Sequence, residues 1–232
     1  MNTRDPNRIT QAITRILIGM IKKFAIADLL AVYSLNATTA HQAGSTLALW
    51  GMLYVYAFRL FFDFSGYTDI AIGIGMLFGL QLPENFNRPY AKNNITTFWQ
   101  SWHATLSAWA RAYVYSPLSR SMIKGKRVSG DVNVLISNLA TMIVIGLWHG
   151  VTIPFVVWGI WHALGLTVHK LWSDRTRSWY RALKEKPAQL RIWSIAGTLL
   201  TFHFVLLGWV WFALPDAATV LYTFGRLFGL GR

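Results

Sequence analysis

The sequence contains no cysteine and few charged residues. Among its 232 residues, 13% are charged, and only 9 are acidic against 22 Lys and Arg. That charged share is about half the share in ordinary soluble domains. The lack of cysteine excludes disulfide bonds and cysteine-based metal sites. The low charge excludes an ordinary water-soluble fold, because a fold of this size needs more polar surface.

Hydrophobic residues make up 54% of the chain, including 12 Trp and 14 Phe. A membrane-spanning helix needs an apolar run long enough to cross ~30 Å of hydrocarbon. Runs near this length occupy residues 45–62, 64–82, 132–149, 151–172 and 192–214. Alternation of apolar and polar residues never runs long enough to suggest a transmembrane β-barrel. The sequence therefore predicts an all-α, polytopic transmembrane protein forming one membrane domain over 1–232, with interfacial or re-entrant helices.

Residues 9–35 form a weaker apolar run, because Lys22 and Lys23 interrupt it. This stretch is compatible with a tilted span, a re-entrant element or an interfacial helix, and its topology stays open at this point. The N-terminus, MNTRDPNRITQAITR, is polar and basic and does not resemble a signal peptide.

The formal net charge is +13, and the positions of the basic residues indicate whether the protein meets a lipid bilayer or a nucleic acid. Five Lys or Arg lie in residues 1–23, seven in 88–127 and seven in 170–191. These clusters flank apolar runs, as the positive-inside rule expects of cytoplasmic loops. We therefore expect a lipid bilayer as partner and no nucleic acid.

A polar and aromatic connection, residues 83–131, separates the first two runs from the later ones. Its opening, PENFNRPYAKNN, carries prolines and asparagines that forbid continuous helix. A helix is predicted over 95–115, capped by Thr96 or Thr97 and ending before Pro117. On such a helix one stripe contains Trp99, His103, Ser107 and Arg111, with Trp102 and Trp109 on a neighbouring stripe. The helix is too polar to face lipid, so we expect it at the interface or in a protein-lined cavity.

Two carboxylates, Asp63 and Asp69, interrupt the apolar run RLFFDFSGYTDIAIGIG. Because 45–82 is too long for one crossing, a break near Gly66 is predicted. The carboxylates could serve acid–base chemistry, pair with Arg59 or Arg88, or cap helix ends beside the break. A structural role is the preferred interpretation.

Histidines are the other ionisable groups in apolar surroundings. His149 and His162 lie on opposite arms of a predicted hairpin, His162 and His169 share a face, and His203 reads as a packing residue. A zinc site would need three ligands at regular spacing, and no HExxH pattern is present. A set of Ser107, His103 and Asp69 lacks a GxSxG elbow.

A buried imidazole can act as a general base toward a hydroxyl during acyl transfer. Trp148 and Gly150, on either side of His149, suit a pocket where a substrate approaches the backbone closely. The residues alone leave packing as the default role of any single histidine.

Several ordered blocks resemble the bacterial membrane-bound O-acyltransferase (MBOAT) family, and its alginate O-acetyltransferase branch in particular. The first block is FFDFSGYTDIAIGIGMLFGLQLPENFNRPYAKNNITTFWQSWHATLSAWARAYVYSPL. It is similar to the pattern FxDFSGYSDxAxG…PxNFxxPYxAxxxxxFWRRWHxSLSxWxRDYxYxPLGG. GLWHGVTIPFVVWGIWHAL is similar to GLWHGxxxxFxxWGxxHG, and KKFAIADLL and TFHFVLLGWVWFALPDAATV match flanking segments.

The resemblance implies O-acyl transfer to a polysaccharide through a funnel across the bacterial cytoplasmic (inner) membrane, in a multi-pass protein. The donor would be acetyl-CoA or another acyl carrier, with no bound cofactor and no metal. The acceptor would be an exopolysaccharide such as alginate. Periplasmic acetylation proteins and a polysaccharide synthase would be partners.

Residue by residue, the resemblance implies that His149 is the essential general base and that His103 supports it. His162 matches a third position whose role is less defined. The remaining residues expected to bind substrate or shape the tunnel are Asp63, Ser65, Tyr67, Asp69, Asn85, Trp102, Ser107, Arg111 and Trp148.

The sequence also departs from the family pattern. FWRRWH reads FWQSWH, so two cations are lost at Gln100 and Ser101, and the acidic residue of RDY is Ala112. The chain resembles only the C-terminal half of family members. Alternatives are therefore a truncated fragment, a non-catalytic transport or scaffold subunit, D-alanyl transfer to teichoic acid and a metal-dependent hydrolase.

Overall fold

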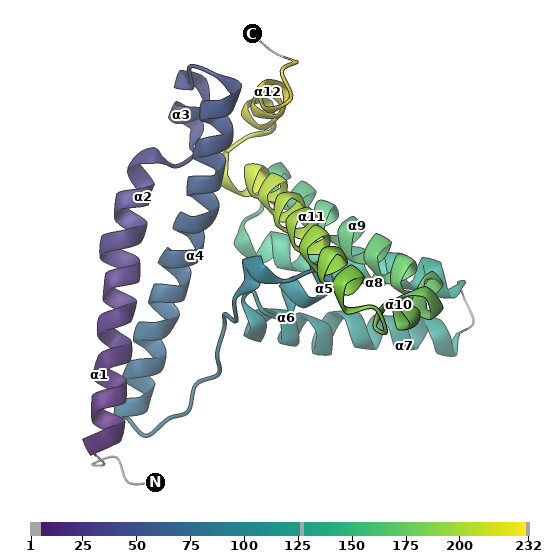
Figure 1. Ribbon diagram of the computed structural model, residues 1–232, viewed down its shortest axis with the longest axis horizontal. Helices are drawn as coiled ribbons and strands as arrows, with labels where there is room; N and C mark the ends of the chain where they lie inside the picture. The colour runs from purple at the N-terminus through teal and green to yellow at the C-terminus, as the bar shows by residue number, and fades with distance from the viewer. Residues whose placement is uncertain (1–5, 126–127, 231–232) are drawn as a thin grey trace. The chain divides into compact units, whose positions relative to one another are not determined.

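A computed structural model describes residues 6–125 and 128–230 (Figure 1). These residues form helices and loops and contain no β-strand, which confirms the all-α prediction. The chain divides into two compact units, one of residues 1–86 and 218–232 and one of residues 87–217. The prediction of a single membrane domain remains a prediction.

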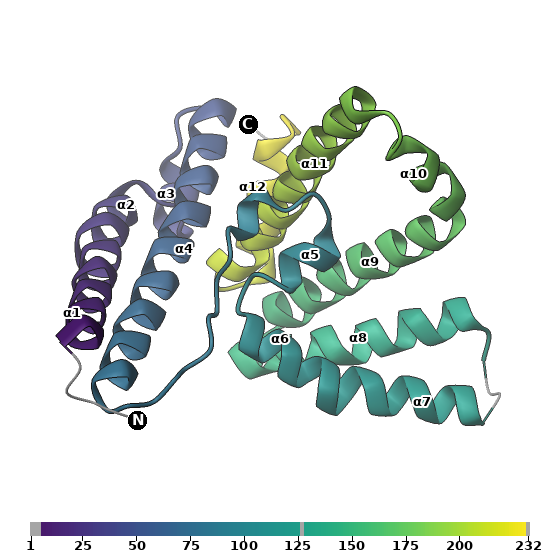
Figure 2. The ribbon, with the colours of Figure 1, turned by 60° about the horizontal axis from the view of Figure 1, so that its bottom comes forward.

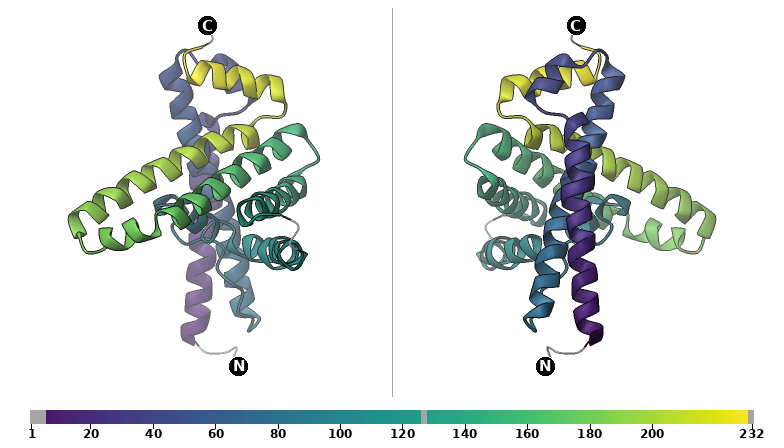
Figure 3. Two further views of the ribbon diagram at one scale, coloured as in Figure 1. Left: turned by 90° about the vertical axis from the view of Figure 1, so that its right-hand side faces the viewer. Right: turned by 90° about the vertical axis from the view of Figure 1, so that its left-hand side faces the viewer.

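The first unit is built on two long antiparallel helical segments, drawn side by side in Figures 1 and 3. One consists of α1 (Pro6–Met20), the π-helix η1 (Ile21–Ala27) and α2 (Asp28–Tyr33), and the other is α4 (Thr46–Leu77). The remaining helices of this unit are α3 (Ala37–Gln42) and α12 (Ala217–Leu227). The weak apolar run 9–35 is thus one nearly continuous helical segment.

Glycine allows α1 and α4 to approach closely. A Cβ at Gly66 would lie 2.7 Å from the carbonyl oxygen of Gly19, and a Cβ at Gly73 would lie 2.8 Å from that of Ala12. Small residues at helix contacts are a common way to pack helices in membranes. Gly66 therefore serves packing, and the predicted break there is wrong, because α4 continues unbroken for 32 residues.

The second unit contains the hairpin of α8 (Gly130–His149) and α9 (Ile153–Arg175), which pack against each other (Figure 2). A Cβ at Gly159 would lie 2.5 Å from the carbonyl oxygen of Met142, so glycine is needed for this contact. Helix α11 (Pro187–Ala213) packs along α9 and follows the short α10 (Arg177–Leu183).

The predicted helix over 95–115 is wrong in two respects. It is divided into α5 (Ile95–Trp99) and α6 (Ala104–Ala110) by a turn in which His103 takes a left-handed conformation with φ of 43°. It also does not end before Pro117. The π-helix η3 (Arg111–Tyr115) leads directly into α7 (Ser116–Lys124), whose first turn accommodates the proline.

The cap of α5 is also different from the one predicted. The Asn94 side chain accepts a hydrogen bond from the Thr97 backbone N–H, so asparagine rather than Thr96 or Thr97 caps the helix. A short 3-10 helix, η2 (Pro89–Ala91), precedes this cap. The stripe of Trp99, His103, Ser107 and Arg111 therefore does not exist as one continuous helix face.

Three helices among the described residues are long and apolar enough to cross a membrane, namely α4, α8 and α11. The runs 45–62 and 64–82 merge into α4, while 132–149 and 192–214 correspond to α8 and α11. Helix α9 covers most of the predicted span 151–172, but it is more polar than these three.

Candidate active site

His149 ends α8, where the chain turns through Gly150 into α9. Phe155, in the first turn of α9, explains why residue 150 is a glycine. A Cβ at Gly150 would lie 2.8 Å from two ring carbons of Phe155, so a larger residue would displace that ring. Gly150 was expected to let a substrate approach the backbone, and in the structure it makes room for the Phe155 ring of the same chain.

Four aromatic rings surround the His149 imidazole. Trp148 and Phe212 have ring centroids at 4.8 Å from it, Trp158 at 5.5 Å and Phe155 at 6.0 Å. The imidazole is half-buried, and it forms no hydrogen bond within the described part of the chain. A half-buried imidazole with an available nitrogen can take a proton from a hydroxyl brought beside it.

His103 approaches the same site from the turn between α5 and α6. Its ring lies edge-on to Trp148, with centroids 5.9 Å apart, so Trp148 contacts both histidines. Burial lowers the pKa of His103 to about 4 because the apolar surroundings disfavour the charged imidazolium. His103 is therefore neutral near pH 7, and the left-handed turn is what directs it here.

His162 lies deeper, one turn beyond Trp158 on α9. It is fully buried, and both ring nitrogens lack a hydrogen-bond partner within the described chain. Its ring lies edge-on to Trp99 at 5.1 Å and to Trp158 at 5.0 Å. Trp158 thus contacts both His149 and His162, which are brought near each other without direct ring contact. His169, seven residues on, bonds Thr96 of α5.

Trp102 and Ser107 support the turn that carries His103. Trp102 is 5% exposed and packs against Trp209 and Tyr90. The Ser107 hydroxyl donates to the Trp102 carbonyl oxygen. Arg111, by contrast, is exposed on η3. The structure therefore gathers His103, Trp148, His149 and His162 around shared aromatic rings, while Arg111 takes no part in the contacts described.

The acidic residues predicted for the tunnel are neutralised within the first unit. Asp63 forms an ion pair with Lys23, and Asp69 pairs with both Arg15 and Lys22. The two lysines that interrupted the apolar run 9–35 are thus the partners of α4 carboxylates. These pairings differ from the Arg59 and Arg88 partners considered from sequence.

Tyr67 and Asn85 also belong to the first unit. Tyr67 is 57% exposed and packs against Phe64, and Asn85 is half-buried. Their roles as tunnel residues stay predictions. Ser65 is buried on α4 beside Gly66, and its hydroxyl has no hydrogen-bond partner in the described residues.

The alternative catalytic groupings find no geometric support. Asp69 is engaged by two cations, and the Ser107 hydroxyl bonds a backbone carbonyl, so no Ser–His–Asp relay connects them. Within residues 6–125 and 128–230, no three His, Asp or Glu side chains lie close enough to hold a metal ion.

Sequence reasoning missed the aromatic residues that define the site. Phe155, Trp158 and Phe212 all contact His149, yet none of them was named as a site residue from sequence. Phe212 comes from α11, more than sixty residues along the chain. The available signal was the fixed Phe and Trp of the resembling family pattern, which fall on Phe155 and Trp158.

A sequence model of the membrane-bound O-acyltransferase family matches residues 1–207. The chain belongs to this family. The match includes His149 and every aromatic residue of its surroundings except Phe212, which lies beyond it.

Named MBOAT relatives act on different polymers. The chain is 36% identical over 230 residues to a probable alginate O-acetylase AlgI of Pseudomonas fluorescens, covering 99% of the chain. It is 35% identical over 213 residues to a peptidoglycan O-acetyltransferase of Helicobacter pylori, covering 92% of the chain. It is 31% identical over 220 residues to a teichoic acid D-alanyltransferase of Streptococcus thermophilus, covering 89%.

The chain corresponds to only part of the length of each of these relatives. It covers 43% of the alginate O-acetylase, 38% of the peptidoglycan O-acetyltransferase and 52% of the D-alanyltransferase. The activity of this chain and its polymer substrate are therefore proposals.

Proposed function

We propose that this chain carries the catalytic histidine of a membrane-bound O-acyltransferase that acetylates a polysaccharide, in a multi-pass protein of the bacterial cytoplasmic membrane. The supporting observation is the half-buried His149 imidazole, which has aromatic neighbours on several sides and no hydrogen bond within the described chain. An acceptor hydroxyl held against this imidazole would find a base in surroundings that exclude most water.

The reaction proposed is transfer of an acyl group from a thioester, such as acetyl-CoA or an acyl carrier, to a hydroxyl. His149 takes the hydroxyl proton as the oxygen attacks the acyl carbon. The new C–O bond forms as the C–S bond breaks, and the proton passes to the departing thiolate. Neutral His103, in contact with Trp148, adds no positive charge beside this base.

The acceptor proposed is an exopolysaccharide such as alginate. Support comes from the alginate O-acetylases among the relatives, which cover 99% of the chain at up to 36% identity. The teichoic acid D-alanyltransferase gives a second candidate within the same chemistry, D-alanyl transfer. Membrane vesicles supplied with labelled acetyl or D-alanyl donors would distinguish the two by which label reaches polymer.

Replacing His149 by Ala should reduce acetyl transfer to polymer by about 10²–10⁴-fold, because a positioned general base contributes that much. The measurement is incorporation of labelled acetyl groups by membranes containing the protein. A matched control is His203→Ala, since His203 on α11 bonds the carbonyl of Leu199 in its own helix. The control should retain transfer.

The outcome of the His149→Ala test also separates catalysis from a scaffold role. Both variants should insert into membranes to the same extent as the unaltered chain. Retained transfer by His149→Ala would contradict the assignment of the base. If the unaltered chain itself transfers no label, a non-catalytic transport or scaffold role would replace the proposal.

A further inference from the structure

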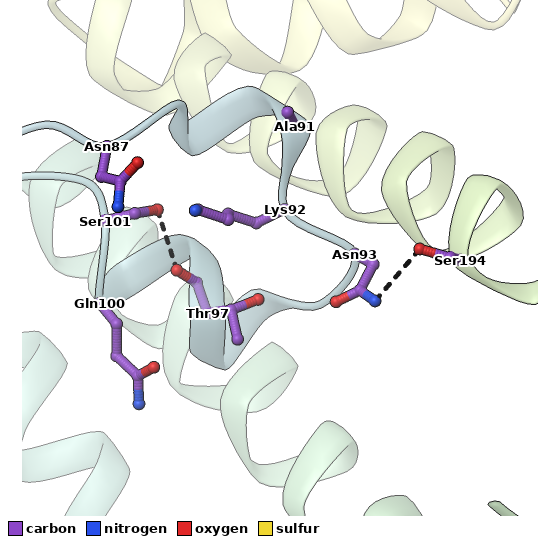
Figure 4. A pocket seen from close by; sticks show the side chains of 8 residues that line it. All are labelled: Asn87, Ala91, Lys92, Asn93, Thr97, Gln100, Ser101 and Ser194. Atoms are coloured by element: carbon purple, nitrogen blue, oxygen red, sulfur yellow. Dashed lines mark hydrogen bonds between the residues drawn. The ribbon is translucent and has the colours of Figure 1, made fainter. Parts of the chain in front are cut away.

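A polar cavity of about 450 Å³ lies in the second unit, away from the rings around His149. It is formed by the segment around η2, by α5 and by the beginning of α11 (Figure 4). The lining residues are Asn87, Ala91, Lys92, Asn93, Thr97, Gln100, Ser101 and Ser194. Its volume falls in the range of small-molecule sites.

Lys92 is the charged residue in this lining, which contains no carboxylate. Figure 4 shows its side chain extending across the cavity toward Ser101. Lys92 is half-buried, and within the described residues its ammonium forms neither a hydrogen bond nor an ion pair. A partly desolvated ammonium without a partner is costly, so the cavity favours an anion.

Neutral hydrogen-bond donors accompany the ammonium. The side-chain amides of Asn87 and Gln100 form no hydrogen bond within the described residues. The Ser101 hydroxyl is engaged with backbone carbonyls, and Asn93 donates to Ser194. The Lys92 ammonium and, on the same side of the cavity, the Asn87 amide are thus available to a ligand.

Ser101 makes the room for that ligand. Its side chain is 4% exposed and faces the cavity, whereas Gln100 points away from Lys92 (Figure 4). The resembling family pattern has arginine at both positions. An arginine at 101 would enter the cavity, so the small serine opens it and leaves Lys92 as its cation.

We propose that this cavity binds a phosphate ester group with a low negative charge, held by Lys92 with Asn87 beside it. Lysine binds phosphate as a point charge, and the lining lacks the planar arginine fork that suits carboxylate and phosphate alike. The phosphate would belong either to the pantetheine arm of an acyl donor or to a phospholipid headgroup. Only the donor source rests on the proposed function.

The test measures binding to the purified chain in detergent micelles. The first pair of probes is 4′-phosphopantetheine and uncharged pantetheine. The second pair is short-chain phosphatidylglycerol and short-chain diacylglycerol, which has no phosphate. In at least one pair, the member with the net negative charge should bind about tenfold or more tightly, as expected of a charge-assisted hydrogen bond.

Variants assign the preference to the cavity. Lys92→Met should abolish the preference, and Ser101→Arg should weaken binding of the favoured probe by filling the space. Lys124→Met, which removes an exposed lysine on α7, should leave the preference intact. Lys92→Arg, which keeps the charge, should retain part of it and shows that loss in Lys92→Met is not unfolding.

A preference confined to the pantetheine pair assigns the site to the acyl donor, and one confined to the lipid pair assigns it to a headgroup. Preference in both supports phosphate binding at the same cavity. Equal binding within both pairs overturns the proposal, as does an equal loss in Lys92→Met and Lys124→Met. The assay needs no turnover, so a failed His149 assignment would leave its result intact.

Discussion

The three histidines near the hairpin differ in how their nitrogens are placed. His149 is half-buried among rings, His103 lies in a left-handed turn against Trp148, and His162 is fully buried without a partner. These differences give each residue its own measurable behaviour, although all three imidazoles have aromatic neighbours.

His103 should make stability depend on pH. Its folded-state pKa of about 4 lies below the 6.5 of an unfolded histidine. Between those values the unfolded chain takes up a proton that the folded chain refuses, so stability falls as pH drops from about 6.5 toward 4. Thermal melting at pH 7.5 and pH 5 should show a smaller decrease for His103→Asn than for the unaltered chain. Equal decreases would contradict the pKa shift.

His162 should be replaceable without loss of stability. Each buried nitrogen without a partner costs about 1–3 kcal/mol, and an apolar side chain of similar size avoids that cost. His162→Leu should therefore melt at the same temperature or higher. Its melting curve in micelles is the measurement, with Trp158→Leu as a control that should melt lower because a large ring is lost. A marked drop for His162→Leu would show that the imidazole is bonded.

At the scale of elements, the structure depends on glycines where helices meet. The clearest case is the crossing of α1 and α4, where the backbones at Gly19 and Gly66 are in contact. Ion pairs from η1 to Asp63 and Asp69 flank the same crossing. The contact and the ion pairs are expected to act together.

Gly66→Val should destabilise the first unit by about 1–3 kcal/mol, the usual cost of forcing extra atoms into a packed contact. Its Cβ would lie 2.7 Å from a backbone oxygen, which cannot move aside as a side-chain tip can. Gly51→Val, on the same helix with open space around its Cβ position, is the matched control. Melting measurements that showed equal effects for the two variants would refute the close contact.

Sequence patterns predicted some of these elements better than others. The apolar runs at 132–149 and 192–214 became α8 and α11 because long unbroken hydrophobicity has few structural outcomes. Gly66 was read as a break because 45–82 is too long for one crossing and this glycine lies in its middle, whereas here it makes room for a partner helix. The turn at His103 could not be foreseen, because left-handed backbone at a histidine is rare.

The candidate site was predictable in part. His149, His103 and Trp148 were identified through their motif, and the structure places them in one cluster of rings. The partners of Asp63 and Asp69 were missed because Lys23 and Lys22 lie 40 and 47 residues away in the chain. Such pairings depend on which helices meet, and a single sequence does not state that.

At the scale of the whole molecule, the basic clusters predict orientation. The basic segments 88–127 and 170–191 should lie on the cytoplasmic side. Helix α8 has 20 residues and so rises about 30 Å, enough to carry His149 toward the opposite side. The hairpin turn is therefore expected at the far end from both clusters.

Single cysteines can test this orientation cleanly, because the chain has none of its own. Ser129→Cys, at the start of α8, and Ser178→Cys, in α10, should react with a membrane-impermeant maleimide only from the cytoplasmic side. Val151→Cys, in the 88% exposed turn position, should react from the other side. Labelling of all three from one side would show that the hairpin does not cross the membrane.

The packing of Phe155 on Gly150 and His149 sets the length of the α8–α9 turn. Phe155 lies only five residues after Gly150, so its ring can contact both residues only if the intervening chain keeps its length. Insertion or deletion of one residue at 151–153 would rotate α9 by about 100° and turn Phe155 and Trp158 away from His149. Natural variation in this turn should therefore consist of substitutions, with its length unchanged.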